Sequence, residues 1–283
     1  MKYAIISDIH GNYPALGAVL ADVKAQGADK YLLLGDYASG YTFCNEVVEA
    51  IRGLENAVII GGNHEGFLRK IQEDPASVDD RSQLIYWCYD NLTADNLGFL
   101  MGLPEMATVS DVNGDIRLNH SISAFFQWPN VLKFFHSVCF REIYVQTPIS
   151  HSERLKLARD EVLANAGAMA EIEVLPKGVY LFGHNHIQFH MEYNGRLFIN
   201  PGACGEPLDG ECSAAYTLLE DGWVTERRVK YDIGKTIDGL RQSSYNTEGN
   251  QRWLQLRAEN IETGLDHFRA AHKRKLSLQK GES

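Results

Sequence analysis

Side chains that bind divalent metal ions are concentrated in a few short motifs of this 283-residue chain. The motifs are Asp8-Ile9-His10, Gly35-Asp36, Gly62-Asn63-His64-Glu65, the single His120 and Gly183-His184-Asn185-His186. Carboxylate, amide oxygen and imidazole together suit borderline divalent ions such as manganese, iron, zinc, cobalt or nickel. The set contains no thiolate, which argues against a structural zinc site.

The elements around the first motifs predict a parallel sheet. In chain order they are strand 3–6, helix 14–26, strand 31–34, helix 43–52 and strand 57–60. Alternation of strand and helix indicates parallel strands, whose carboxyl ends bind ligands in open α/β sheets. Asp8, Asp36 and Asn63 each follow one of these strands, with Asn63 and His64 expected on a loop. A single Gly-Asp or His-x-His has an ordinary structural explanation. Motifs that follow successive strands predict one shared site.

The rest of the chain predicts more helices and a second set of strands. We expect helices 83–91, 94–101 and 152–164, a hairpin of strands 106–110 and 115–119, and strands 179–182, 189–193, 197–199, 214–219 and 223–229. The hairpin turns at Asn113-Gly114, a strong turn signal. No repeat or linker divides the sequence. We therefore expect one metal-binding domain over residues 1–232 and a helical extension over residues 233–283, packed on or trailing from it.

Composition restricts the classes of partner and location. The net charge of −10 disfavours stable binding to duplex nucleic acid, although bound metal ions can still attract a phosphorylated substrate. The five cysteines are odd in number and form no Cys-x-x-Cys pair, so free, buried thiols are expected. Nothing resembles a signal peptide, and no run approaches the roughly 20 apolar residues of a membrane span. We expect a cytoplasmic protein.

The motif series resembles the calcineurin-like metallophosphoesterase superfamily over residues 8–202. Ser7-Asp8-Ile9-His10-Gly11-Asn12 and Asn200-Pro201-Gly202 look like its small prokaryotic phosphodiesterase and asymmetric dinucleoside polyphosphatase branch. The resemblance implies an α/β fold, a four-layer α/β/β/α sandwich with two mixed β-sheets packed face to face. It also implies two divalent transition-metal ions per chain, of manganese, iron, zinc, nickel or cobalt.

The resemblance assigns a role to each motif residue. The ligands of the first ion would be Asp8, His10, Asp36 and His186. The ligands of the second ion would be Asp36, Asn63, His120 and His184, so that Asp36 is shared. A hydroxide bridging the ions would attack phosphorus. His64 would face the phosphate and the leaving group, where an imidazole can act as an acid near neutral pH.

Two positions depart from the family pattern. The protein-phosphatase-like branch carries Gly-Asp-x-x-Asp-Arg-Gly, whereas this chain has Ser39 in place of the second acid and lacks the arginine. This difference disfavours a protein phosphatase and leaves open which group orients His64. His120 is followed by Ser121 where the family often has glycine, and His136 and His151 are competitors for its role.

The resemblance implies hydrolysis of a phosphodiester or phosphoanhydride in a small, nucleotide-type substrate. A non-catalytic scaffold of this fold and a nuclease are the alternatives, distinguished by metal content and by nucleic-acid binding. Asn12 either contacts a substrate oxygen or closes the loop after His10. Aromatic residues of segment 121–146 either stack on a base or form a hydrophobic subcore: Phe125, Phe126, Trp128, Phe134, Phe135 and Phe140. Arg117 and Arg141 either bind phosphate or are solvated surface charges.

Overall fold

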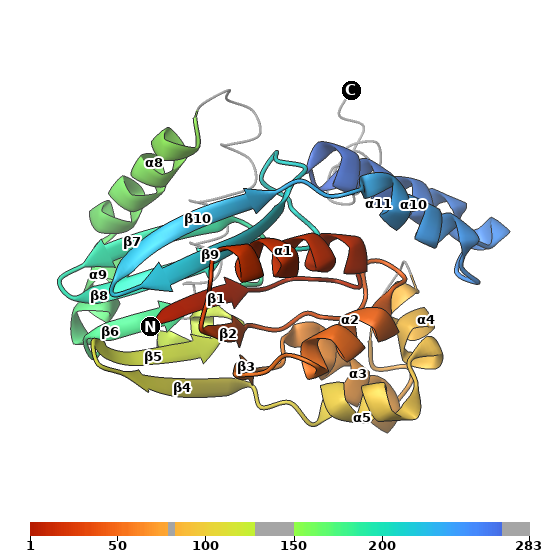
Figure 1. Ribbon diagram of the computed structural model, residues 1–283, viewed down its shortest axis with the longest axis horizontal. Helices are drawn as coiled ribbons and strands as arrows, with labels where there is room; N and C mark the ends of the chain where they lie inside the picture. Colours follow the sequence, from red (N-terminus) through yellow and green to blue (C-terminus); the bar gives the residue numbers. More distant parts are fainter. Residues whose placement is uncertain (79–82, 128–149, 268–283) are drawn as a thin grey trace.

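Two five-stranded β-sheets form the centre of the computed structural model, which describes residues 1–78, 83–127 and 150–267 (Figure 1). The first sheet has the order β10-β9-β1-β2-β3 and the second has the order β4-β5-β6-β8-β7. The strands of the first sheet are β1 (Lys2–Ile6), β2 (Lys30–Leu33), β3 (Ala57–Ile59), β9 (Ala214–Glu220) and β10 (Trp223–Val229). The strands of the second sheet are β4 (Met106–Asp111), β5 (Gly114–Asn119), β6 (Gly178–Leu181), β7 (Gln188–Tyr193) and β8 (Arg196–Pro201).

Both sheets are mixed. Strands β1, β2 and β3 pair in parallel, as their alternation with helices predicts, whereas β9 runs antiparallel to β1. In the second sheet β5, β6 and β8 are parallel, and β4 and β7 are antiparallel edge strands. The predicted hairpin is confirmed as β4 and β5, with Asp111 paired to Gly114 across the turn. The parallel strands direct their carboxyl ends to the loops that carry the metal-binding motifs.

The sheets pack face to face, and helices cover both outer faces. Alternation along β1 separates the layers: Tyr3 and Ile5 belong to the core between the sheets, whereas Ala4 and Ile6 face the helices. The helices beside the first sheet are α1 (Tyr13–Ala25), α2 (Cys44–Arg52), α3 (Asn63–Glu73), α4 (Leu84–Asn91) and α5 (Ala94–Met101). Those beside the second sheet are α8 (His151–Ala164), α9 (Ala166–Val174) and the 3-10 turn η1 (Ile122–Phe125). The expected four-layer α/β/β/α sandwich is confirmed.

Helices α3 and α9 were not expected from the sequence. The motif Gly62-Asn63-His64-Glu65, predicted to lie on a loop, instead begins α3, with Gly62 as the N-cap residue. Glu65 caps the start of the helix by accepting a hydrogen bond from the Gly62 N–H at 2.7 Å, which is one half of a capping box. The loop prediction was wrong because ligand types in a row were interpreted as loop residues, although Glu65 three residues after Gly62 is a helix-start signal.

The C-terminal helices pack against the sandwich. They are α10 (Ile233–Gln242), the 3-10 turn η2 (Glu248–Asn250) and α11 (Gln251–Thr263), drawn in blue in Figure 1. Leu240, Leu254 and Ile261 of this region form a buried cluster with Tyr41 and Leu84. Burying each such aliphatic side chain contributes about 1.5–3 kcal/mol, so the contact is a substantial one.

Four cysteines lie within the described residues, and all four are free thiols. Cys44, Cys88 and Cys204 are buried as expected, whereas Cys212 is partly exposed. The Sγ atoms of Cys44 and Cys88 lie 2.8 Å apart between α2 and α4. Cys139 lies outside the described residues. Among the described helices, none combines the length and the apolar character that crossing a bilayer requires.

Candidate metal centre

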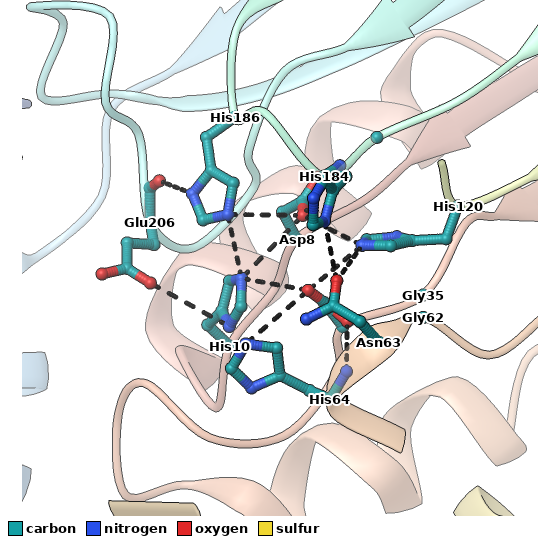
Figure 2. Close-up of polar contacts among 12 residues, drawn as sticks. Asp8, His10, Gly35, Gly62, Asn63, His64, His120, His184, His186 and Glu206 are labelled. Atoms are coloured by element: carbon teal, nitrogen blue, oxygen red, sulfur yellow. Dashed lines mark hydrogen bonds and ion pairs between the residues drawn. The ribbon is translucent and has the colours of Figure 1, made fainter. Parts of the chain in front are cut away.

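The predicted ligand residues converge at the loops that follow strands of both sheets. Asp8 and His10 follow β1, Asp36 follows β2, His120 follows β5, and His184 and His186 lie between β6 and β7. Asn63 and His64 lie in the first turn of α3. Figure 2 shows the side chains that it labels directed toward one another: Asp8, His10, Asn63, His64, His120, His184 and His186. Three groups have ligand atoms within 4.8 Å of one another: Asp8, His10 and His186; Asp36, His120 and His184; and His10, Asp36 and His64.

In the first group, the Nε2 atoms of His10 and His186 lie close together. Nε2 of His10 lies 3.2 Å from Nε2 of His186, and Oδ1 of Asp8 lies 3.5 Å from the latter. The Nδ1 atoms of the two rings lie 2.7 Å from the carbonyl of Ser39 and 2.6 Å from the carbonyl of Glu206, respectively. A carbonyl oxygen can only accept a hydrogen bond, so each neutral ring carries its proton on Nδ1 and directs a lone pair from Nε2.

The nitrogen and oxygen atoms of this group are arranged as ligands of a cation. Burial lowers the pKa of His10 to about 3, so its ring is neutral near pH 7. The Nε2 lone pair of His10, Nε2 of His186 and a carboxylate oxygen of Asp8 then point at a common position. Metal-binding histidines commonly donate their other ring N–H to a backbone carbonyl, as both rings do here. The group therefore fits a divalent metal ion.

The second group repeats this chemistry. Nε2 of His120 lies 3.1 Å from Oδ2 of Asp36 and 3.0 Å from Oδ1 of Asn63, while its Nδ1 donates to the Leu34 carbonyl at 2.8 Å. Nδ1 of His184 lies 2.7 Å from the same Asn63 oxygen. In the metal-free chain burial disfavours a charged His120, but the carboxylates of Asp36 and Asp8 outweigh burial and raise its pKa to about 10. The same carboxylate charge that raises the pKa of His120 would attract a cation to this group.

Asp36 lies between the two groups. Its Oδ2 atom is 3.8 Å from Nε2 of His10 and 3.1 Å from Nε2 of His120, and only 1% of the residue is exposed. Its Oδ1 atom accepts the backbone N–H of His64 at 2.9 Å, at the start of α3. Burial opposes ionisation of Asp36, but the charge on His120 and the hydrogen bond from its ring outweigh burial and hold the pKa of Asp36 well below the usual value. One anionic carboxylate therefore faces both groups.

The backbone at the site is strained. Five of the predicted ligands have φ between 51° and 72°, a left-handed conformation that few non-glycine residues adopt: Asp8, His10, Asp36, His184 and His186. Such strain costs of order 1–3 kcal/mol per residue and clusters at functional sites. The adjacent glycines leave room for the ligands, because a Cβ atom on Gly62 would lie 2.2 Å from Oδ1 of Asp36.

Glu65 ties two ligand-bearing segments together. Its fully buried carboxylate accepts the backbone N–H groups of Asp36 and Tyr37, both at 2.9 Å, and that of Gly62 at 2.7 Å. The loop after β2 is thereby joined to the first turn of α3. The relative position of Asp36 and Asn63 depends on this carboxylate.

His64 differs from the other histidines of the site. Its side chain is 22% exposed, whereas those of His10, His120 and His186 are at most 8% exposed. Nε2 of His64 lies 3.9 Å from Oδ2 of Asp36. Nδ1 of His64 is buried and has no hydrogen-bond partner among the residues that the structure describes. Ser39 does not orient this ring; its carbonyl instead accepts the N–H of His10.

Glu206 is a site residue that sequence reasoning did not find. Its carbonyl accepts Nδ1–H of His186, and its Oε2 atom lies 3.9 Å from Nδ1 of His10. Burial would raise the pKa of Glu206, but the guanidinium of Arg257 outweighs burial and lowers it. Glu206 stands in no motif, and only the fold brings Arg257 of α11 to it.

The remaining candidates lie away from the metal-binding groups. Asn12 is fully buried: Oδ1 accepts the N–H of Ala15 as the cap of α1, and Nδ2 donates to the Gly205 carbonyl at 2.8 Å. The structure thus gives Asn12 the loop-closing alternative rather than a surface for substrate. His151 instead pairs with Glu226. Arg117 forms an ion pair with Asp115 at 3.1 Å.

The described part of the aromatic segment is a hydrophobic subcore. The rings of Phe125 and Phe126 pack on Tyr180 and Phe198 of the second sheet, with centroids 5.2 and 6.0 Å apart, respectively. The turn Asn200-Pro201-Gly202 supports the loop of His184 and His186, because Nδ2 of Asn200 donates to the Gly183 carbonyl at 2.9 Å. The other expected positions lie outside the described residues: Trp128, Phe134, Phe135, His136, Phe140 and Arg141.

Comparison with known proteins identifies the family. The model of the calcineurin-like phosphoesterase superfamily domain matches residues 1–221, so the chain belongs to this superfamily. A curated, uncharacterized protein of Methanocaldococcus jannaschii is 27% identical over 240 residues, covering 84% of this chain and 90% of the relative.

Solved structures share the fold. A metallophosphoesterase from Sphaerobacter thermophilus has a TM-score of 0.61 at 24% identity, covering 94% of this chain and 99% of its own. A hypothetical protein from Pyrococcus horikoshii has a TM-score of 0.64 at 18% identity, covering 88% and 96%. Family membership together with the Asp and His groups supports phosphoester hydrolysis and the binding of divalent metal.

Proposed function

We propose that this chain hydrolyses a phosphodiester or phosphoanhydride bond in a small, nucleotide-type substrate with two divalent metal ions. The observation that carries the proposal is the position of Asp36. A single buried carboxylate faces two groups of metal-ligand atoms, one with His10 and the other with His120. Sharing one anion between two cations is the arrangement that two-metal phosphoryl transfer requires.

The ligand sets divide between the two groups. One ion would be held by Asp8, His10, Asp36 and His186, and the other by Asp36, Asn63, His120 and His184. The ions would supply positive charge for the phosphoryl oxygens and a water acidified to act as the nucleophile. Nitrogen and oxygen donors without thiolate suit manganese, iron, zinc, nickel or cobalt.

His64 would act on the leaving group. Its side chain is 22% exposed, more than those of His10 and His120 beside Asp36, and its ring meets that of His10 edge-on with ring centroids 4.8 Å apart. A partly exposed imidazole beside the shared carboxylate can donate a proton to a departing alkoxide, or neutralise charge on the phosphoryl group. Nδ1 of His64 is buried and has no described partner, so no described residue fixes the orientation of the ring through this atom.

The preference for a small diester or anhydride rests on the loop after β2. Ser39 replaces the second acid of the protein-phosphatase pattern, and its buried backbone serves His10. The net charge of −10 opposes long polyanions. The acidic protein surface repels long polyanions, whereas a small anion can still bind to the positive charge of the metal centre.

A substrate panel tests this proposal. Phosphomonoesters, phosphodiesters, cyclic nucleotides, dinucleoside polyphosphates and a phosphoserine peptide are assayed with manganese, nickel, cobalt and zinc. We expect the highest kcat/KM for a diester or phosphoanhydride. A higher kcat/KM for the phosphopeptide than for every nucleotide would contradict the proposal, and a chain that retains no metal ion would favour a scaffold instead.

A further inference from the structure

We propose that Arg257, acting through Glu206, is a positioning residue for the metal-binding group of Asp8, His10 and His186. The C-terminal helix α11 would then control the affinity of one of the two metal positions. This inference rests on the two-metal function proposed above and extends it to residues beyond the family match, which ends at residue 221.

Glu206 lies next to the rings of His10 and His186, on the side of their Nδ1 atoms. Its carbonyl accepts Nδ1–H of His186 at 2.6 Å, and Oε2 of its carboxylate lies 3.9 Å from Nδ1 of His10 (Figure 2). Both contacts are to the ring nitrogen that faces away from the shared lone-pair position. Glu206 therefore holds the direction of Nε2 of His186, and its carboxylate places negative charge beside His10, whose Nδ1–H is donated to the Ser39 carbonyl.

The segment that carries Glu206 has little freedom beside the loop after β1. The N–H of Cys204 donates to Ser7 and that of Gly205 donates to Asp8, both at 2.9 Å. A Cβ atom on Gly205 would lie 1.8 Å from the carbonyl oxygen of Ile9, so only glycine fits. A shift of this segment would therefore be transmitted directly to Asp8 and His10.

Helix α11 holds the other side of the same segment. The guanidinium of Arg257 forms an ion pair with the Glu206 carboxylate, and the two side chains are 12% and 8% exposed. The N–H of Gly210 donates to the Gly264 carbonyl at 2.9 Å, and Sγ of Cys212 donates to the Glu262 carbonyl at 2.9 Å. The end of α11 is thus bound to the segment at three points.

The second metal-binding group has different supports. Nδ1 of His120 is held by the Leu34 carbonyl, and Asn63 is placed by the first turn of α3. Neither contact involves Glu206 or α11. Loss of Arg257 should therefore weaken one metal position and spare the other, whereas general destabilisation would weaken both.

Calorimetric titration of the full-length, metal-free chain with manganese tests this inference. We expect Arg257→Gln to weaken one of two binding events by about 10- to 100-fold, the range typical for partners that orient metal ligands. Arg257→Lys should recover part of the affinity. Arg252→Gln is the matched control, because Arg252 is an exposed residue of the same helix.

Turnover at saturating manganese separates positioning from substrate contact. We expect Arg257→Gln to regain wild-type kcat and KM when both positions are filled, since the ring directions are then enforced by the ions. A KM that stays raised would overturn the positioning role. Unchanged affinity at both positions, or an equal loss at both, would overturn the inference as well.

Glu206→Gln provides a second variant if Arg257→Gln does not fold. It keeps the carbonyl that accepts from His186 and removes only the charge, so the same selective loss is expected. Wild-type stoichiometry distinguishes the two proposals. Two ions in the wild type with unaltered variants would refute only the role of Arg257, whereas a single ion in the wild type would refute the two-metal function and this inference together.

Discussion

The Oδ2 atom of Asp36 lies 3.1 Å from Nε2 of His120. Both side chains are buried, and Nδ1 of the histidine is already hydrogen-bonded to the Leu34 carbonyl. The contact therefore joins the loop after β2 in one sheet to the end of β5 in the other sheet. Removing the charge of Asp36 or of His120 would therefore affect the ligand residues contributed by both sheets.

We predict that Asp36→Asn weakens the binding of both metal ions. Asparagine has the same shape but carries no charge, so each ion loses its share of one anion. Elemental analysis after reconstitution with manganese would show fewer than two ions per chain. Asp160→Asn, on the exposed face of α8, is the control for loss of one acidic group. Full occupancy in the Asp36 variant would contradict the shared-ligand assignment.

We predict that His64→Ala folds and retains its metal ions but loses about 100- to 10,000-fold in turnover, the usual contribution of a positioned acid or base. The loss should be smaller for an activated aryl ester than for an alkyl ester, because a better leaving group needs less protonation. Steady-state assays combined with metal analysis check both statements.

The alternative for His64 is a ligand role. His10, Asp36 and His64 also form a group with ligand atoms within 4.8 Å of one another. A His64→Ala variant that loses a metal ion, yet turns over normally at saturating manganese, would show that this histidine binds metal. Unchanged turnover with both ions bound would remove it from catalysis.

We predict that Gly62→Ala disrupts the metal centre without extensive loss of the helix that it precedes. A Cβ atom there would lie 2.2 Å from Oδ1 and 2.7 Å from the backbone nitrogen of Asp36, and both belong to a buried segment. Manganese titration should show weakened binding. Gly17→Ala is the control, because nothing lies within 4 Å of its Cβ position in α1. That substitution should stabilise the helix by about 0.5–1 kcal/mol, as measured by urea unfolding.

We predict a pH-dependent contribution to stability from Glu226 of β10. Burial opposes its ionisation, but hydrogen bonds from His151 and His190 outweigh burial and lower its pKa from 4.5 to about 2. A lowered carboxyl pKa stabilises the folded state above pH 4.5, and this stabilisation is lost as the pH falls toward 2. The difference in unfolding free energy between wild type and Glu226→Gln should therefore shrink over this interval, from about 2–3 kcal/mol.

Urea unfolding at several pH values measures this difference. Glu161→Gln, on the exposed side of α8, controls for the removal of one acidic group. A difference that stays constant down to pH 2 would show that Glu226 does not titrate in the way its partners imply.

The sequence predicted those helices and strands that are marked by neighbouring residues, through an apolar pattern and a residue that ends the element. Strand β1 and helix α1 are marked by a short apolar run and by an apolar stripe that ends near Gly27, and both were placed to within one residue at either end. The ligand types were also visible, because they follow strands and several of them, such as Asp36, Asn63 and His184, stand beside a glycine. Parallel strands then brought Asp8 and Asp36 to one edge.

The supporting contacts could not be predicted in the same way. Arg257 and Glu206 are 51 positions apart, and no spacing relates them. Their pairing depends on how α11 packs against Tyr41 and Leu84, which is a tertiary property. Helix α9 was missed because residues 166–174 have no apolar stripe that distinguishes one face.

The strand order has a consequence for synthesis of the chain on the ribosome. Strand β1 emerges first, but one of its two neighbours is β9, residues Ala214–Glu220. Until that segment leaves the ribosome, one edge of β1 has no partner, and the last predicted ligand along the chain, His186, has only recently been made. A nascent chain thus exposes an unpaired strand edge for most of its translation and acquires its full ligand set late. The complete ligand set can therefore form only after the segment that carries His184 and His186 has left the ribosome.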